Sequence, residues 1–201
     1  MELVLPAAPE ELINEADFEL DERLPYWADL WPSARALARW VLEEPDLPPT
    51  AVELGCGVGL PSLALLSREV ETLATDYYGD ALLFAGENAR RNSLPPLRTL
   101  LLDWRDPPAE LPRFPLVVAA DVLYEARNGV ALRGLLPGLV APGGRVIIAD
   151  PDRSCLPEFL SDAEGDGWRV TPLTERMEEA PAGHGLFTRV RLFELSRQDL
   201  L

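Results

Sequence analysis

Residues 51–60 read AVELGCGVGL, a short apolar run that ends near an acid and continues into a glycine-rich turn. The run has the length and residue types of a buried strand. Gly55, Gly57 and Gly59 then recur at every second position, and residues 60–69 have the pattern of a helix. Glycine lets the backbone adopt positive φ and approach a ligand closely, and the first N–H groups of a helix point towards such a ligand. The stretch therefore predicts a binding turn between a strand and a helix.

The spacing of the glycines argues against two phosphate-binding turns. The dinucleotide fingerprint is G-x-G-x-x-G, but position 60 is leucine, and Glu53 would place an anion beside a pyrophosphate. The sequence G-x-x-x-x-G-K-[ST] is absent, and the chain has no lysine to complete one. An acid beside the turn suits a cationic ligand group. We therefore expect an adenosine that carries a positive charge rather than phosphates.

Strand and helix patterns alternate on both sides of this turn. The alternation predicts an α/β fold, a Rossmann-like three-layer sandwich whose seven-stranded sheet is mostly parallel with one antiparallel strand near the C-terminus. Pro137 and Gly138 are expected to shorten or break one helix. The predicted strands are 50–54, 71–76, 97–103, 115–121, 143–150, 168–173 and 187–195, and the predicted helices are 31–44, 60–69, 79–93, 129–140 and 156–166. We expect one structural domain, in which an acidic segment and a first helix (1–48) pack on a core (49–201).

Acids fall at or near the ends of five of these strands. Each alone would be explained as the cap of a following helix. Together they predict a rim of hydrogen-bond acceptors at the edge of the sheet where ligands of parallel sheets bind. The glycine turn lies on the same rim. The five acids are Glu53, Asp76, Asp103, Asp121 and Asp150.

The segment VELGCGVG resembles the first motif of the class I S-adenosylmethionine-dependent methyltransferases, E/D-x-G-x-G-x-G. The resemblance implies that the glycine turn and Glu53 bind the cofactor, that Asp76 accepts the two ribose hydroxyls, and that Asp103 accepts the adenine amino group. It also implies that Trp104 packs on the adenine ring. The plainer alternatives are a helix cap for Asp76 and a strand end for Asp103.

Three further segments resemble the protein-lysine methyltransferases, including those that act on the β subunit of electron-transfer flavoprotein. YWADLWPSARALARWVL (26–42) resembles the segment that precedes their core, which implies that Trp31 approaches the methionine end of the cofactor. DVLYE (121–125) resembles their D-x-x-Y motif and implicates Asp121, beside the cofactor, and Tyr124 in catalysis. DPDR (150–153) resembles D-P-G-R and places Asp150 and Arg153 near the substrate.

The resemblance predicts transfer of a methyl group from S-adenosylmethionine to a lysine of a protein, with S-adenosylhomocysteine as the product. Asp121 would accept a hydrogen bond from the amine, while Tyr124 and Trp31 would form pocket walls that favour a cation. Each has a structural alternative, since Trp31 would also serve as a core aromatic, Tyr124 as the anchor of a helix start and Arg153 as a surface residue. The competing functions are methylation of a small amine or other metabolite, and a catalytically degenerate fold that binds a partner.

Composition sets limits on partners and location. The net charge is −16, and all 18 cationic residues are arginine. Such a chain repels nucleic acid and anionic membranes and attracts a basic protein, which the acidic residues 10–22 would help to recruit. The lack of lysine is explained by coding bias or by avoidance of self-methylation. Cys56 and Cys155, the only cysteines, are expected to be reduced in a cytoplasmic monomer without a signal peptide. Neither a metal site nor a ligand role for the single histidine, His184, is predicted.

Overall fold

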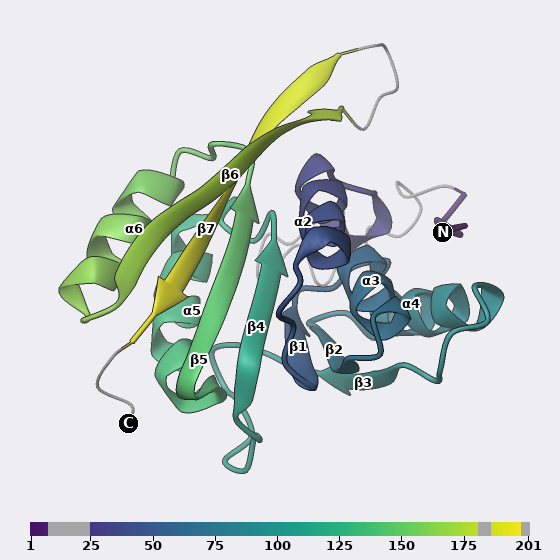
Figure 1. Cartoon of the computed structure of the whole chain (residues 1–201), viewed down its shortest axis with the longest axis horizontal. Helices are drawn as coiled ribbons and strands as arrows, with labels where there is room; N and C mark the ends of the chain where they lie inside the picture. Colours follow the sequence, from purple (N-terminus) through teal and green to yellow (C-terminus); the bar gives the residue numbers. More distant parts are fainter. Residues whose placement is uncertain (8–24, 181–185, 198–201) are drawn as a thin grey trace.

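The computed structural model of the protein describes residues 1–7, 25–180 and 186–197, and its centre is one seven-stranded sheet (Figure 1). The strand order is β3-β2-β1-β4-β5-β7-β6. Only β7 runs antiparallel to its two neighbours, β5 and β6, so the predicted mostly parallel sheet is confirmed. The strands are β1 (Thr50–Leu54), β2 (Glu71–Asp76), β3 (Arg98–Leu101), β4 (Phe114–Ala120), β5 (Val140–Asp150), β6 (Arg169–Glu179) and β7 (Phe187–Ser196).

Helices cover both faces of the sheet, as the three-layer prediction requires. Helices α5 (Ala126–Leu139) and α6 (Leu156–Gly165) lie on one face, and α2 (Pro32–Glu43) and α3 (Leu60–Ser67) lie on the other. Alternate residues of a strand serve the two cores because side chains of a strand point to opposite faces. In β4, Val117 and Ala119 pack with α5 and α6, whereas Leu116 and Val118 pack with α2 and α3. Helix α4 (Gly79–Arg91) covers β2 and β3.

The order of the strands sets the place of the site. The chain moves from β1 outward to β2 and β3, and then returns to the other side of β1 to form β4. The loops that leave β1 and β4 therefore diverge at the carboxyl edge of the sheet, and this point is where open α/β sheets bind ligands. The glycine turn leaves β1 at that edge, and Asp121 leaves β4 beside it.

The prediction for Pro137 is wrong. Helix α5 begins at Ala126 and continues through Pro137 to Leu139. Proline removes a backbone hydrogen bond and strains the preceding turn of a helix. Pro137 is partly buried, and Leu135, Leu136 and Leu139 of the same helix end are buried, each at most 5% exposed. Their packing outweighs the local cost of one proline in the last turn.

The last two strands extend beyond their predicted ends. β6 continues to Glu179 and pairs with β7 up to Phe187, so the hairpin rises past the carboxyl edge of the sheet (Figure 1). The acidic sequence of 175–179 does not predict a strand, because it lacks the apolar alternation of one. Its carboxylates form ion pairs in the structure. Glu178 pairs with Arg39 of α2 at 3.0 Å, and Arg176 pairs with Glu43.

Two sequence predictions fall on residues outside the described part of the chain. These are the recruiting role of the acidic segment 10–22 and the absence of a ligand role for His184. Within the described ranges, no helix combines the length and apolar character needed to cross a membrane.

Candidate active site

The glycine turn adopts backbone conformations that suit glycine. Gly55, Gly57 and Gly59 have φ of +67°, +51° and +87°. A Cβ added at Gly57 would lie 3.1 Å from the carbonyl oxygen of Trp27, and one added at Gly59 would lie 2.7 Å from the Cβ of Ala85. Both the left-handed backbone and the close neighbours therefore explain why these positions are glycine.

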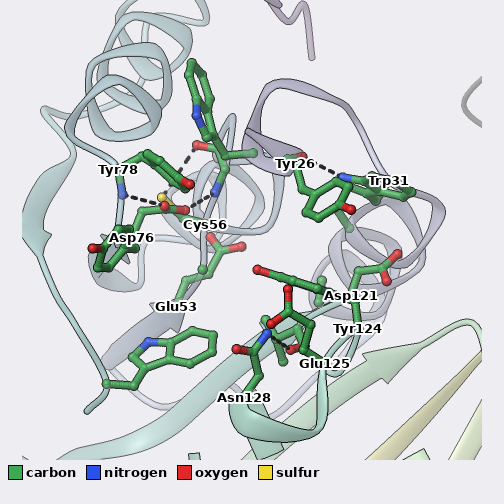
Figure 2. A pocket seen from close by; sticks show the side chains of 18 of the residues that line it. Tyr26, Trp31, Glu53, Cys56, Asp76, Tyr78, Asp121, Tyr124, Glu125 and Asn128 are labelled. Carbon is green, nitrogen blue, oxygen red and sulfur yellow. Dashed lines mark hydrogen bonds between the residues drawn. The ribbon is translucent and has the colours of Figure 1, made fainter. Parts of the chain in front are cut away.

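Asp76, the last residue of β2, is fixed beside the turn. One carboxylate oxygen accepts the N–H of Gly57 at 2.9 Å, and the other accepts the N–H of Tyr78 at 2.9 Å (Figure 2). The residue is only 5% exposed but lines the cavity described below. The structure thus brings Asp76 and the glycine turn together, as the sequence predicted. The ribose contact itself stays a prediction.

Glu53 lies beneath the turn and bonds to the start of α3. Its carboxylate accepts the backbone N–H of Ser62 at 2.8 Å and also the hydroxyl of Ser62. The residue is 1% exposed, and burial raises its pKa to about 8 despite these two hydrogen bonds. Without a ligand it is therefore mainly protonated at neutral pH. Its predicted contact with a cationic ligand group would require a neighbouring positive charge to ionise it.

Asp103 and Trp104 follow β3 and line the same cavity. Asp103 forms an ion pair with Arg105 at 2.7 Å and accepts its backbone N–H at 2.9 Å. The ring of Trp104 lies against Gly55, where an added Cβ would be 3.4 Å from the ring. The indole nitrogen of Trp104 is buried and has no hydrogen-bond partner in the part of the chain that is described. The two predicted adenine contacts therefore lie together at one end of the cavity.

Asp121, directly after β4, holds the other end. Its backbone has φ of +59°, and its N–H donates to the carbonyl of Ala149 at 2.9 Å. One carboxylate oxygen, Oδ1, accepts Nε of Arg153 at 2.7 Å, and the other, Oδ2, accepts the hydroxyl of Ser33 at 3.3 Å. Burial raises the pKa of Asp121, while Arg153 and Ser33 act in the opposite direction. The carboxylate is thus held in place by two different elements.

The predicted substrate residues Asp150 and Arg153 have different positions. Arg153 lines the cavity, and its guanidinium lies over the ring of Trp31, 5.3 Å from the ring centroid. Asp150 is fully buried and is not among the described residues that line the cavity. Its carboxylate accepts the backbone N–H of Arg153 at 2.7 Å, and burial raises its pKa to about 6. Asp150 therefore fixes the loop that carries Arg153, and its substrate contact stays a prediction.

Three aromatic side chains of the cavity lining lie close to Asp121 (Figure 2). Tyr26 meets Tyr124 with ring centroids 5.2 Å apart and meets Trp31 with centroids 6.1 Å apart, both edge to face. The indole nitrogen of Trp31 donates to the carbonyl of Tyr26 at 2.7 Å. We call Tyr26, Trp31 and Tyr124 the aromatic cluster. Trp31 and Tyr124 were predicted, and Tyr26 was missed although it belongs to the same aromatic-rich segment.

Ser33 was also missed, and nothing in the sequence marks it. Its hydroxyl reaches Asp121 because Ser33 lies in the first turn of α2, which begins at Pro32 and packs on the sheet. The tertiary arrangement of α2 and β4, rather than a local pattern, creates this contact.

One cavity of about 270 Å³ joins both ends. It runs from the glycine turn, Asp76 and Trp104 to Asp121 and the aromatic cluster. Its lining suits a nucleoside at the first end, and the second end combines the carboxylate of Asp121 with the rings of the aromatic cluster. Within the described ranges, no group of three or more His, Cys, Asp or Glu residues is arranged to hold a metal ion.

Known proteins resemble most of this chain in sequence. A family model described as lysine methyltransferase matches residues 22–163. The electron transfer flavoprotein β-subunit lysine methyltransferase of Rattus norvegicus is 32% identical over 142 residues, which are 67% of this chain and 52% of that protein. The ribosomal protein L11 methyltransferase of Azotobacter vinelandii is 33% identical over 159 residues, 78% of this chain and 52% of that protein. The chain spans about half the length of these relatives.

Solved structures share the fold. The ribosomal protein L11 methylase of Lactobacillus delbrueckii subsp. bulgaricus superposes with a TM-score of 0.64 at 20% identity, covering 82% of this chain and 78% of that one. The magnesium protoporphyrin IX methyltransferase of Synechocystis PCC 6803, solved with bound S-adenosylmethionine, superposes with a TM-score of 0.60 at 17% identity and covers 82% of this chain and 78% of that one. At these identities the likeness establishes the fold alone.

Proposed function

Since the chain belongs to the lysine methyltransferase family of class I methyltransferases, we propose that it transfers a methyl group from S-adenosylmethionine to the side-chain amine of a lysine in a protein. The observation that carries this proposal is the single cavity that joins the glycine turn to Asp121 and the aromatic cluster. A methyltransferase needs both ends in one space, because the nucleophile must meet the methyl carbon in line.

The first end of the cavity fits the cofactor. Gly55 and Gly57 line this end of the cavity, and positive φ at all three glycines gives the turn a backbone that L side chains rarely adopt. Asp76 is the expected acceptor for the ribose hydroxyls, and Asp103 with Trp104 would hold the adenine. Glu53 would ionise in response to a positive charge nearby. When bound, S-adenosylmethionine supplies an electrophilic methyl carbon whose bond to sulfur breaks as a bond to nitrogen forms, leaving S-adenosylhomocysteine.

The second end fits an amine. The carboxylate of Asp121 is held by Arg153 and Ser33, so it is a fixed acceptor for one amine N–H. The aromatic cluster removes water from the amine and thereby favours its neutral, nucleophilic form. The same ring faces would stabilise the methylated cation that results. These residues orient the nitrogen lone pair, and the proton that the amine loses before the reaction passes to solvent.

The substrate is proposed to be a basic protein. The names of two related methyltransferases refer to protein targets, the β subunit of electron transfer flavoprotein and ribosomal protein L11. The net charge of −16 favours a positively charged partner and disfavours nucleic acid. We place the enzyme in the cytoplasm as a monomer, with Cys56 and Cys155 as free thiols. Methylation of a small amine is the alternative.

Calorimetric titration with S-adenosylmethionine and, separately, with NADH tests the cofactor. We expect saturable binding of S-adenosylmethionine alone. Binding of NADH alone would contradict the proposal, and binding of neither would favour a degenerate fold that has lost its cofactor.

A labelling experiment then tests the substrate. The protein is incubated with methyl-labelled S-adenosylmethionine and with a basic cytoplasmic protein fraction, purified electron transfer flavoprotein β subunit or purified ribosomal protein L11. Because the enzyme contains no lysine, every methyl-lysine found by mass spectrometry comes from the added protein. Labelling only in a fraction of small molecules would favour the metabolite alternative.

A further inference from the structure

The proposed function raises an electrostatic difficulty at Asp121. A lysine amine has an unperturbed pKa of about 10.4 and must lose its proton before it can accept a methyl group. A carboxylate within hydrogen-bond distance favours the charged ammonium form, which is the unreactive one. An isolated Asp121 would therefore bind the substrate lysine in the wrong protonation state.

The position of Arg153 answers this difficulty. Both Nε and one terminal nitrogen of its guanidinium lie 2.7 Å from Oδ1 of Asp121. Both of these close contacts of the guanidinium are therefore made with the same oxygen of the carboxylate. Among the described residues, Oδ2 accepts only the hydroxyl of Ser33, at a long 3.3 Å, and keeps the capacity to accept a second hydrogen. The pair is close to neutral overall, yet it retains an acceptor.

The loop that carries Arg153 is fixed from two sides. Asp150 accepts the backbone N–H of Arg153 at 2.7 Å. Asp152 has φ of +65° and forms an ion pair with Arg189 of β7 at 2.6 Å and another with Arg191. Stacking on Trp31 fixes the guanidinium itself. Arg153 is thus held against Asp121 by its own backbone contacts and by the ring beneath it.

Other charged groups near the pair do not replace Arg153. Asp150 and Asp152 add negative charge from the loop after β5, and Asp29, Asp76 and Glu125 add it from the cavity lining. Glu53 adds to it as the pH rises through its pKa of about 8. Arg127 lies on the lining but pairs with Glu125, and Arg105 pairs with Asp103. Among the described residues, Arg153 is the cation for which an ion pair with Asp121 is observed.

We propose that Arg153 is a positioning residue that balances the charge of Asp121, so that this end of the cavity receives the neutral amine of a substrate lysine rather than its ammonium form. The inference rests on the proposed function. It requires no group beyond those present, because the proton released by the amine enters solvent before the amine binds. Asp121 then accepts a hydrogen bond from a neutral donor and does not stabilise a charge.

The test measures amine binding instead of turnover. The protein is saturated with S-adenosylhomocysteine, and the affinity for Nα-acetyl-lysine methylamide is measured by NMR titration across alkaline pH. For the wild type, the apparent association constant should rise about tenfold per pH unit well below the amine pKa, in step with the neutral fraction. In Arg153→Gln, no arginine neutralises the carboxylate of Asp121, which therefore also binds the ammonium form of the amine. The affinity should then be nearly independent of pH. Arg153→Lys keeps the charge and should restore the wild-type slope.

A matched control and a folding check accompany these variants. Arg133→Gln removes one arginine that pairs with Asp162 and Asp166, away from the cavity lining, and should keep the wild-type slope. Glu53 titrates in the same pH range but is present in every variant, so its effect cancels in the comparison. Melting temperature and affinity for S-adenosylhomocysteine report whether Arg153→Gln remains folded.

The outcomes separate this inference from the proposed function. Equal slopes for the wild type and Arg153→Gln, or a pH-independent affinity of the wild type, would overturn the role of Arg153 alone. If no variant binds the amine while all bind S-adenosylhomocysteine, the amine does not bind at Asp121 and the inference is overturned, but the cofactor assignment stands. Failure to bind S-adenosylhomocysteine would remove the proposed function and the inference together.

Discussion

The guanidinium of Arg153 bonds to the carboxylate of Asp121 at 2.7 Å, although the two residues are 32 positions apart and follow different strands. Asp121 leaves β4 and Arg153 follows β5, and these strands pair in parallel, so their carboxyl ends deliver both side chains to one point. We therefore expect a replacement of Asp121 to disturb this end of the cavity and to leave the glycine turn unchanged.

We expect Asp121→Ala to lower kcat/KM for methylation of the substrate protein by at least about 100-fold, because a fixed acceptor no longer positions the amine. The affinity for S-adenosylmethionine should change by less than about tenfold, which corresponds to 1.4 kcal/mol. Calorimetry and initial rates measure the two quantities. Asp121→Asn, which tolerates the φ of +59°, controls for backbone strain. Loss of cofactor binding in both variants would reassign Asp121 to the cofactor.

Gly59→Ala should destabilise the protein by more than about 2 kcal/mol, since it combines a left-handed backbone with an overpacked contact. The added Cβ would lie 2.7 Å from the Cβ of Ala85 at φ of +87°. Gly143→Ala is the matched control, because its φ is +70° but no heavy atom lies within 4 Å. It should lose only about 1 kcal/mol from the backbone term. Urea unfolding measures both, and equal losses would mean that the contact with Ala85 relaxes freely.

The stability of the ligand-free protein should depend on the ionisation of Glu53. Burial raises the folded-state pKa of Glu53 from 4.5 to about 8. A group whose pKa is raised on folding gives its full stability below the unfolded-state pKa, and that stability is lost as the pH rises through the folded-state value. The melting temperature should therefore fall between about pH 5 and pH 8, in part through this residue.

Glu53→Gln provides the comparison, because glutamine imitates the protonated carboxyl and still accepts the N–H of Ser62. Its melting temperature should decline less over the same range and exceed that of the wild type at alkaline pH. Asp150, with a pKa raised to about 6, contributes a smaller decline at lower pH in both proteins. If the melting temperatures of wild type and variant depended on pH in the same way, ionisation of Glu53 would not destabilise the folded protein.

The ion pairs of Asp152 should stabilise the loop in a salt-dependent way. Asp152 binds Arg189 and Arg191, and exposed pairs of this kind contribute about 0.2–1 kcal/mol each. Asp152→Asn should lose about 1 kcal/mol at low salt and less at high salt, because ions screen the interaction. Asp152→Ala should lose about 1 kcal/mol more, since alanine is poor at φ of +65°. An asparagine variant whose deficit is the same at both salt concentrations would contradict an ionic role.

The parts of this molecule that follow local rules were predictable from its sequence. The buried strands 50–54 and 71–76 have their predicted bounds, since apolar runs between breaking residues leave little choice. The acids at the strand ends lie on the cavity for the same reason, with Asp150 as the exception because it ends β5 but faces the interior. The backbone of residues 150–153 turns back towards that carboxylate, and no sequence pattern predicts this turn.

Features that arise from tertiary contacts were not predictable. Pro137 stays helical because three leucines are buried around it, and β6 continues through an acidic stretch because arginines of α2 neutralise it. Ser33 reaches Asp121 across 88 residues of sequence. In each case a partner that is distant in the chain decides the outcome, and a single sequence does not say which partner that is.

The contact between Gly57 and Trp27 has a mechanical consequence. A Cβ at Gly57 would lie 3.1 Å from the carbonyl oxygen of Trp27. The backbone next to Tyr26 therefore packs directly against the glycine turn. A ligand that orders the turn would also order Tyr26 of the aromatic cluster, and a substrate bound by that cluster would in the same way order the turn. Such coupling is reciprocal by thermodynamic necessity. Any change that one ligand causes in the affinity for the other would therefore be matched, by the same factor, in the effect of the second ligand on the first.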